Sequence, residues 1–218
     1  FASALHYVAL DRSANRMNSY EGSLQYDKVV SDSVPLKGLV GCILSNELVD
    51  SFPVHRFEVQ DGEIKEIFVT VVDDKIAEHL DVPCYPNTKR VKESLGSGIW
   101  GKGRMEINAG IPSWLAQANG SLERGFVLTV DYGYESIKRQ YERSRQGTVQ
   151  TYYQHSQGSS PYDLVGFQDI TAHVDFSSIV LEGALLGLAP VVMLTQRELL
   201  QLLGLDVWIR RLRSMDIS

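Results

Sequence analysis

Three short apolar runs, each leading into a polar residue, constrain the fold more than any other feature of this sequence. The runs are residues 5–10, 39–44 and 126–130, and they lead into Asp11, Asn46–Glu47 and Asp131 respectively. Short, nearly continuous apolar runs are typical of parallel strands that are covered on both faces. Together with the helical patterns between them, they predict an α/β fold built on a mostly parallel, doubly wound sheet.

The rest of the chain adds further elements to this pattern. Helices are predicted at 14–24, 74–80, 112–120, 175–183 and 199–203, the last opened by the capping box Thr195–Glu198 and ended by Gly204. Strands are predicted at 29–30, 104–108 and 188–194, and a β-hairpin over 55–72 turns at Asp61–Gly62. Residues 83–103 are expected to be mostly loop, and the polar residues 135–162 a long excursion near a site.

Composition narrows the class of protein and of partner. The chain has 218 residues, 44% of them apolar and 22% charged, with a net charge of −6, which fits one α/β domain or a domain with an insertion. The sequence has no basic block, which argues against nucleic acid and is compatible with a cationic partner. The longest apolar stretch, residues 185–194, is too short to cross a bilayer. Cys42 and Cys84 lack disulfide or zinc spacing, which indicates a reducing compartment.

The polar residues after the apolar runs are the candidate site, because such sheets bind ligands beyond the carboxyl ends of their strands. A carboxylate at Asp11 suits the two hydroxyls of a ribose, although an acid there also favours a helix N-terminus. Glu47 and Asp50 are three residues apart, so a helical turn would put both carboxylates on one face, to hold a guanidinium or deprotonate an amine. A solvated loop before the Phe52–Pro53 turn is the alternative.

Two further motifs are weaker. Gly96–Gly101 matches GxGxxG, but it precedes a predicted strand instead of following one, so we interpret it as a surface loop. His173-Val174-Asp175, with His155 as a second imidazole, matches part of a two-histidine, one-carboxylate iron site. Asp175 is also expected to cap a helix, so we predict no metal site. His173 and Asp169 stay candidates for the lining of a polar pocket.

Four blocks of sequence and a short C-terminal segment occur in an order that is similar to one known family. They are residues 45–57 (SNELVDSFPVHRF), residues 125–134 (GFVLTVDYGY), Gly147–Thr148 with His155, residues 166–176 (GFQDITAHVDF) and residues 203–207 (LGLDV). The first block resembles the signature ANE-x-x-DALPV-x-x-F of the MidA-like methyltransferases. That family includes the mitochondrial complex I assembly arginine methyltransferase.

The resemblance implies a class I methyltransferase (Rossmann-like) fold, a doubly wound sheet with an inserted β-hairpin and loop excursions, that uses S-adenosyl-L-methionine. It places Asp11 at the ribose, where the family more often has glutamate, and Asp32 near the adenine. Asn46 and Glu47 would lie beside the transferred methyl group, with Asp50 close by, and Asn46 would also contact the cofactor. The implied substrate-side residues are Asp131, Tyr132, Gly133, His155, Asp169, His173 and Asp175.

One departure from the family concerns the cofactor loop. The family's glycine-rich loop follows a strand that would precede Asp11, and this sequence has no counterpart of either. We therefore expect residues 1–218 to be the C-terminal part of a single catalytic domain, with the N-terminal strand and helices missing and with insertions at about 54–103 and 135–162. Such a fragment would bind cofactor weakly or not at all.

The predicted function is methylation of a protein side chain such as arginine, and a respiratory-complex subunit is the substrate protein that the resemblance suggests. The sequence is compatible with a homodimer. It is also compatible with two locations, the bacterial cytoplasm and the matrix of a mitochondrion or plastid. Two alternatives are kept. The chain could be a non-catalytic assembly factor that binds a partner through this fold, or a methyltransferase that acts on a small molecule.

Overall fold

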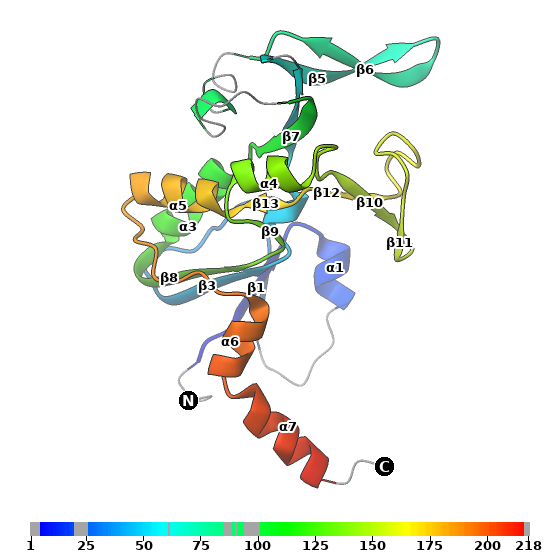
Figure 1. The fold of residues 1–218 in the computed structure, drawn as a ribbon. Coiled ribbons are helices and arrows are strands. Elements are labelled where there is room, and N and C mark those ends of the chain that lie inside the picture. The colour runs from blue at the N-terminus through cyan, green and yellow to red at the C-terminus, as the bar shows by residue number, and fades with distance from the viewer. Residues whose placement is uncertain are drawn as a thin grey trace.

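The computed structural model describes residues 5–19, 26–60, 62–84, 89, 91–93 and 101–215 (Figure 1). Its strands are β1 (Val8–Asp11), β2 (Asp27–Val30), β3 (Leu39–Asn46), β4 (Val54–Gln60), β5 (Glu63–Val72), β6 (Lys75–Asp81), β7 (Gly103–Asn108), β8 (Leu122–Val130), β9 (Gly133–Tyr134), β10 (Gln150–Tyr153), β11 (Ser156–Gln157), β12 (Asp169–Thr171) and β13 (Val174–Asp175). Its helices are α1 (Ala14–Ser19), the 3-10 helix η2 (Val49–Ser51), α3 (Ile111–Ser121), α4 (Ile137–Arg143), α5 (Phe176–Leu185), α6 (Gln196–Leu202) and α7 (Leu205–Ser214). The predicted α/β class is confirmed.

Two pairs of parallel strands carry most of the residues that the sequence places at strand ends. β1 pairs with β2, with Asp11 opposite Val30. β3 pairs with β8, with Asn46 opposite Val130. Because β3 and β8 run in the same direction and end in register, the residues that follow them emerge at one edge of the sheet. The parallel pairing predicted from the apolar runs is confirmed.

α3 and α5 pack against each other and close one face of the β3–β8 pair (Figure 1). α3 has Pro112 in its first turn and α5 has Asp175 as its N-cap, and the sequence predicts both signals. The buried side chains between these elements are Val49, Ile111, Trp114, Leu115 and Val174. This core therefore also holds η2, which carries Asp50, and β13, which directly precedes α5.

The other face of the β3–β8 pair differs from the prediction that both faces are covered. Val40 and Leu44 on β3 and Phe126 and Leu128 on β8 are all exposed, with Phe126 63% accessible. An apolar run specifies a strand that is able to be buried on both sides. In the described part of the chain, helices cover only one side.

An antiparallel sheet with the order β6-β5-β4-β7 forms the second part of the fold. The predicted β-hairpin is confirmed, because β4 pairs with β5 in register, although Asp61 in its turn lies outside the described residues. α4 packs against β7, and the buried side chains are Phe57, Val59, Val91, Met105, Ile107, Ile137 and Tyr141. The predicted excursion at 135–162 therefore contains a helix that closes a core, followed by β10 and β11.

The helix predicted at 74–80 is wrong, because this segment is strand β6, paired with β5 over its whole length. Ile76 and Leu80 are four residues apart, a spacing that fits a helix face. Residues at even spacing also share one face of a strand, so the pattern does not separate the two structures. The turn between β5 and β6 favours the strand. Asp73 and Asp74 have φ values of 48° and 58°, the conformation of a two-residue hairpin turn.

The strand predicted at 188–194 is also wrong, because these residues form a connection without strand pairing to any described residue. The Leu188 N–H donates to Gly183 O at the end of α5, at 2.9 Å, and its side chain packs against the core under that helix. The predicted helix at 14–24 is described only as far as Ser19. Most of residues 83–103, predicted as loop, lie outside the described residues.

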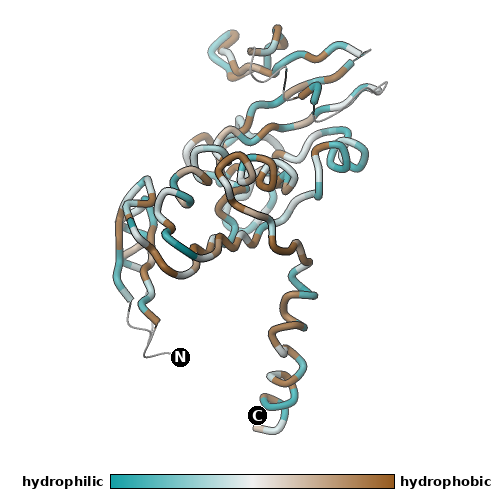
Figure 2. Tube along the Cα trace, turned by 90° about the vertical axis from the view of Figure 1, so that its left-hand side faces the viewer, coloured by the Kyte–Doolittle hydropathy of each residue, from teal (hydrophilic) through white to brown (hydrophobic). Residues whose placement is uncertain are grey.

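The C-terminal helices α6 and α7 lead away from the rest of the fold (Figures 1 and 2). The predicted capping box is confirmed, since Thr195 Oγ1 accepts from Glu198 N and Glu198 accepts from Thr195 N. Gly204, with φ of 84°, follows α6 and opens α7, so it fits its predicted place at a helix end. Neither helix buries a residue. Among the described residues, no helix combines the length and apolar content needed to cross a membrane.

We predict that Gly125→Ala destabilises the fold through the β3–β8 pair. Gly125 has φ of 152°, and a Cβ there would lie 1.8 Å from Gly41 O, its partner across the strands. Urea unfolding should show a loss of about 2 kcal/mol or more. Gly41→Ala is the matched control, because a Cβ at Gly41 meets nothing within 4 Å. It should change stability by less than about 1 kcal/mol. Equal effects of the two variants would contradict this account.

Candidate active site

The candidate site lies at the carboxyl ends of β3 and β8. Asn46 ends β3 and is exposed, and the Glu47 N–H donates to Val130 O at 2.9 Å, which continues the ladder beyond the strand. Glu47 has φ of 47°, a left-handed conformation that is unusual for a residue with a side chain. The chain therefore turns sharply at Glu47, and this side chain is exposed at the edge of the sheet.

Asp131 connects the end of β8 to the turn after β3. Its Oδ2 accepts from Val49 N at 3.0 Å and from Asp50 N at 3.3 Å, and its Oδ1 accepts from Tyr132 N at 2.9 Å. Partial burial, and after it the charge of Asp50, raise the pKa of Asp131 to about 6, although the three amide donors lower it. One carboxylate therefore links the first amides of η2 to the backbone that follows β8.

Asp50 is buried at 4% exposure and holds the ring of Tyr132. The Tyr132 hydroxyl donates to Asp50 Oδ2 at 2.6 Å. Burial, and then the hydrogen bond to Asp50, raise the pKa of Tyr132, so the phenol is protonated at neutral pH. The Asp50 carbonyl also accepts from Ala172 N at 2.9 Å. Among the described residues, Asp50 Oδ1 has no hydrogen-bond partner.

His173 lies between two tyrosine rings. Its ring centroid is 5.2 Å from that of Tyr132, edge to face, and 5.3 Å from that of Tyr134. Burial lowers the pKa of His173, so the imidazole is neutral at pH 7. The neighbouring Val174 N–H donates to Tyr132 O at 3.0 Å, and Val174 pairs with Gly133. A Cβ at Gly133 would lie 2.0 Å from Val174 O, so this close approach requires glycine.

Beneath His173 lies a buried polar group that sequence reasoning does not find. Glu106 accepts from Thr148 N, Thr148 Oγ1 and Gln140 Nε2, each at 2.9 Å, and Thr148 Oγ1 accepts from His173 N at 3.2 Å. Burial raises the pKa of Glu106. Gly147–Thr148 stood out in the sequence, and Tyr134 ends the block 125–134, but nothing there indicated Glu106 or Gln140. Their part in the site follows from the packing of β7 and α4.

The structure brings five of the predicted residues together. Asp131, Tyr132, Gly133 and His173 form one contiguous group with Asp50. Asn46 and Glu47 lie at the edge of the sheet where β3 ends. Asp175 pairs with Tyr134 next to the group and caps α5 by accepting from Ser177 N at 3.1 Å. His155, in the turn between β10 and β11, and Asp169, at the start of β12, are exposed and, among the described residues, make no hydrogen bond or ring contact with the group.

The sequence predicts that Glu47 and Asp50 share one face of a helical turn. This prediction is wrong. η2 begins only at Val49, and Glu47 precedes it with a left-handed backbone. Glu47 is therefore exposed, whereas Asp50 is buried against Tyr132. A single turn of helix is too short for a spacing of three to fix both side chains on one side.

Two predicted cofactor-binding residues lie at the ends of the other parallel pair, β1 and β2. Asp11 ends β1, is partly exposed, and accepts from Ser13 N through Oδ1 at 2.8 Å. Asp32 follows β2 and is exposed. Apart from Gly101, the Gly96–Gly101 motif lies outside the described residues. Among the described residues, no group of three or more His, Cys, Asp or Glu side chains has the arrangement of a metal site.

Comparison with known proteins identifies the family. Residues 1–191 match the family described as "Putative S-adenosyl-L-methionine-dependent methyltransferase". The chain belongs to this family. No curated protein matches the chain. The blocks that resemble the MidA-like methyltransferases lie almost entirely within the matched residues.

Two solved structures share the fold of this methyltransferase family member, and both are COG1565 superfamily proteins from Burkholderia thailandensis. One, with S-adenosyl-homocysteine bound, is 23% identical with a TM-score of 0.67, covering 84% of this chain and 48% of that chain. The other, a native crystal structure, is 22% identical with a TM-score of 0.68, covering 84% of this chain and 50% of that chain. These likenesses show a class I methyltransferase-like fold. The chain spans about half the length of the structures that it matches.

We predict that Asp131 makes stability depend on pH. Its pKa of about 6 exceeds the ordinary 3.8, so the folded protein binds this proton more tightly than the unfolded chain does. The resulting stabilisation is fully present below about pH 4 and is lost as the pH rises through about 6. Between these limits, the free energy of unfolding of the wild type should fall relative to that of Asp131→Asn. After solvent screening of this half-buried group, the change should be about 1 kcal/mol.

The measurement is urea unfolding of both proteins at several pH values. Asp169→Asn, which changes an exposed carboxylate, is the matched control and should follow the wild type throughout. A constant difference between Asp131→Asn and the wild type from pH 4 to 7 would contradict the assignment.

Proposed function

We propose that this protein is an S-adenosyl-L-methionine-dependent methyltransferase that modifies a protein side chain, with arginine as the preferred acceptor. The observation that carries the proposal is the polar group at the carboxyl ends of β3 and β8, in a chain of this family. An exposed carboxylate, Glu47, follows the end of β3, and Tyr132, whose protonated phenol is held by the buried Asp50, follows the end of the paired strand β8. Carboxylates that hold and deprotonate a cationic nitrogen are the groups that such a reaction needs.

The described residues fit the cofactor at three positions, at the ends of β1, β2 and β3. A carboxylate has about four acceptor positions, so Asp11 is able to accept from ribose hydroxyls while its Oδ1 holds Ser13 N. Asp32 would lie on the adenine side, and Asn46 offers an exposed amide at the end of β3. When bound, S-adenosyl-L-methionine supplies a methyl group on a sulfonium. The Burkholderia thailandensis neighbour with S-adenosyl-homocysteine bound supports this choice of cofactor.

The substrate side is argued from the rigid group around His173. Tyr132 is held by Asp50, its backbone by Asp131, and the imidazole between Tyr132 and Tyr134 is neutral, so it adds no charge that would repel a cation. The faces of tyrosine rings attract guanidinium groups. In this proposal Glu47 would orient the acceptor nitrogen and take its proton as the N–C bond forms and the sulfonium–methyl bond breaks, which leaves S-adenosylhomocysteine. The protein contributes mainly orientation and electrostatics.

A non-catalytic assembly factor is the second candidate, and the exposed apolar face of β3 and β8 favours it. Phe126, Leu128, Val40 and Leu44 lie together on that pair, and contiguous exposed apolar surface often marks a protein interaction site. A respiratory-complex subunit is the partner suggested by the sequence resemblance. A methyltransferase that acts on a small molecule is the third candidate, and the test below separates all three.

We predict that Glu47→Gln lowers turnover about a hundredfold or more while cofactor affinity changes little, because the amide can no longer accept the proton. The measurement is transfer of tritiated methyl groups into the proteins of a cell extract by the natural full-length protein, with calorimetry of S-adenosylhomocysteine binding beside it. Glu142→Gln, an exposed glutamate on α4, is the matched control and should keep full turnover.

Each outcome has one interpretation. Unchanged turnover in Glu47→Gln removes Glu47 from the mechanism. Label that enters only small molecules overturns the protein substrate. Cofactor binding without any transfer supports the assembly factor, and no cofactor binding overturns the methyltransferase proposal.

A further inference from the structure

The hairpin of β5 and β6 ends the antiparallel sheet with an open edge. In the order β6-β5-β4-β7, β6 is the outermost strand, and over the described residues no strand pairs with its outer side. The opposite edge is different, because β7 is joined to residue Gln146 by a bridge at Arg104 and packs against α4. Figure 1 shows the β5–β6 hairpin projecting away from the rest of the fold.

The hairpin turn determines which backbone groups of β6 point outward. Asp73 and Asp74 form a two-residue turn, so the flanking pair Val72–Lys75 exchanges hydrogen bonds across the hairpin. Hydrogen-bonded and non-hydrogen-bonded pairs alternate along an antiparallel ladder. The N–H and C=O groups of Ile76, Glu78 and Leu80 therefore point away from β5. These three residues offer the donors and acceptors that an added strand needs.

Two of the three β6 side chains on one face of this edge, Ile76 and Leu80, are apolar, and Glu78 lies between them. Ile76 pairs with Val71, Glu78 with Val69 and Leu80 with Ile67, so these side chains share one face of the sheet. Val69 and Val71 are 59% and 66% exposed, and Ile76 and Leu80 are both 40% exposed. An edge strand with exposed apolar neighbours is the usual template for binding an extended peptide.

Carboxylates lie at both ends of this edge. Asp73 and Asp74 form the turn, and Asp81 ends β6, against a single lysine, Lys75, on the strand. Glu78, in the middle, is already neutralised. It accepts from Arg56 Nη1 at 2.6 Å and lies 3.0 Å from Arg104 Nη1. The charge left over is therefore negative and is concentrated at the two ends.

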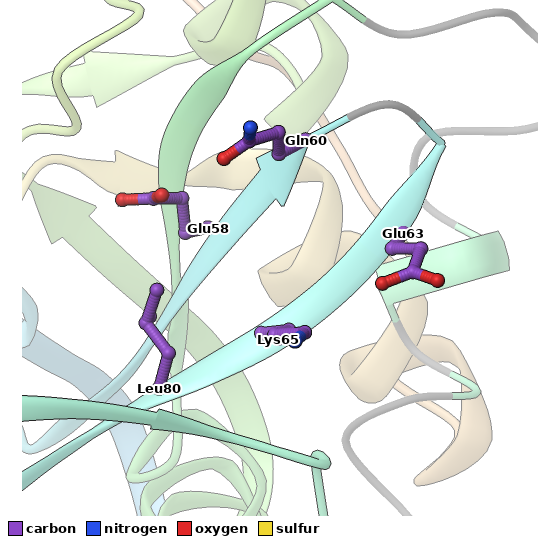
Figure 3. Close-up of a pocket in the computed structure, with 5 residues that line it drawn as sticks. All are labelled: Glu58, Gln60, Glu63, Lys65 and Leu80. Atoms are coloured by element: carbon purple, nitrogen blue, oxygen red, sulfur yellow. The ribbon is translucent and has the colours of Figure 1, made fainter.

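A cavity of about 420 Å³ adjoins the edge at the Asp81 end (Figure 3). It is lined by Glu58 and Gln60 on β4, Glu63 and Lys65 on β5, and Leu80 on β6. Figure 3 shows Glu58 and Glu63 on opposite sides of it. Glu58 is held by Arg104 Nε at 3.1 Å, whereas Glu63 is exposed. An added strand would lie about 4.8 Å from β6, so a long basic side chain is able to reach this cavity past Leu80.

We propose that the outer edge of β6 and this cavity bind an extended peptide segment of a partner protein, with apolar residues in its centre and basic residues at its ends. The segment pairs with Ile76, Glu78 and Leu80, and its apolar side chains cover Ile76 and Leu80. Its basic ends lie beside Asp73–Asp74 and beside Asp81 and Glu63. A second copy of this chain would bring the same carboxylates to the edge, and like charges across strands are destabilising. This inference does not depend on methyl transfer.

The test is a synthetic peptide with two arginines at each end and alternating valine and threonine between them. Its binding to the natural full-length protein is followed by fluorescence anisotropy. We expect saturable binding that weakens at least tenfold when alternate peptide nitrogens are N-methylated, because a methylated strand cannot pair. We also expect at least tenfold weaker binding when glutamate replaces the arginines. The protein double variant Glu63→Lys with Asp81→Lys should weaken binding to a similar degree, whereas Asp206→Lys, on α7, should not.

Amide hydrogen exchange supplies a readout that general charge attraction does not reproduce. The amides of Ile76, Glu78 and Leu80 should exchange fast in the free protein and become protected with the peptide, while those of Ala77 and His79 are protected in both. Absence of binding, binding that tolerates N-methylation, or unprotected amides at Ile76, Glu78 and Leu80 overturns the proposal. Concentration-dependent self-association in sedimentation that the double variant abolishes also overturns it, because the edge then belongs to a second copy.

Discussion

The carboxylate of Asp131 is the interaction on which the arrangement of the site depends. β3 and β8 end side by side, and the chain after β3 must turn immediately into η2. Asp131 accepts from the first amides of that turn and from Tyr132, so one side chain joins both strand ends. Without this acceptor, amides in a half-buried turn would lose their partner, at a cost of about 1–3 kcal/mol each. The position of Asp50, and through it that of Tyr132, follows from this bond.

A second set of contacts, around His173, supports the residues that Asp131 holds. Tyr132 and Tyr134 flank His173, and His173 is held through Thr148 by the buried Glu106. Glu106 lies on β7, so the antiparallel sheet supports the site. The hydrogen bond from Thr148 to Glu106 joins residues that are more than forty positions apart in the sequence. The same sheet ends in the open edge of β6. Its inner strands therefore stabilise the candidate active site, while its outer strand is available to a partner.

Much of this arrangement is predictable from sequence because it rests on local rules. The parallel strands, the caps at Asp175 and Thr195 and the β4–β5 hairpin follow from apolar runs, capping residues and turn residues. The helix predicted at 74–80 was wrong because the spacing of Ile76 and Leu80 fits both a helix and a strand. Glu106 and Gln140 could not be foreseen, because their contacts join segments that only the tertiary fold brings together. The separation of Glu47 from Asp50 likewise depends on one left-handed residue.

The most direct test of the central claim is calorimetric titration of S-adenosylhomocysteine into the natural full-length protein and into its Asp11→Asn variant. If the cofactor lies at the carboxyl ends of β1 and β3, the wild type binds, and the variant binds about tenfold more weakly or worse, because a carboxylate bonded to two hydroxyls is lost. Asp206→Asn, on α7, should bind like the wild type. Equal affinity of wild type and Asp11→Asn would contradict this placement of the cofactor, and no binding to the wild type would contradict the methyltransferase account itself.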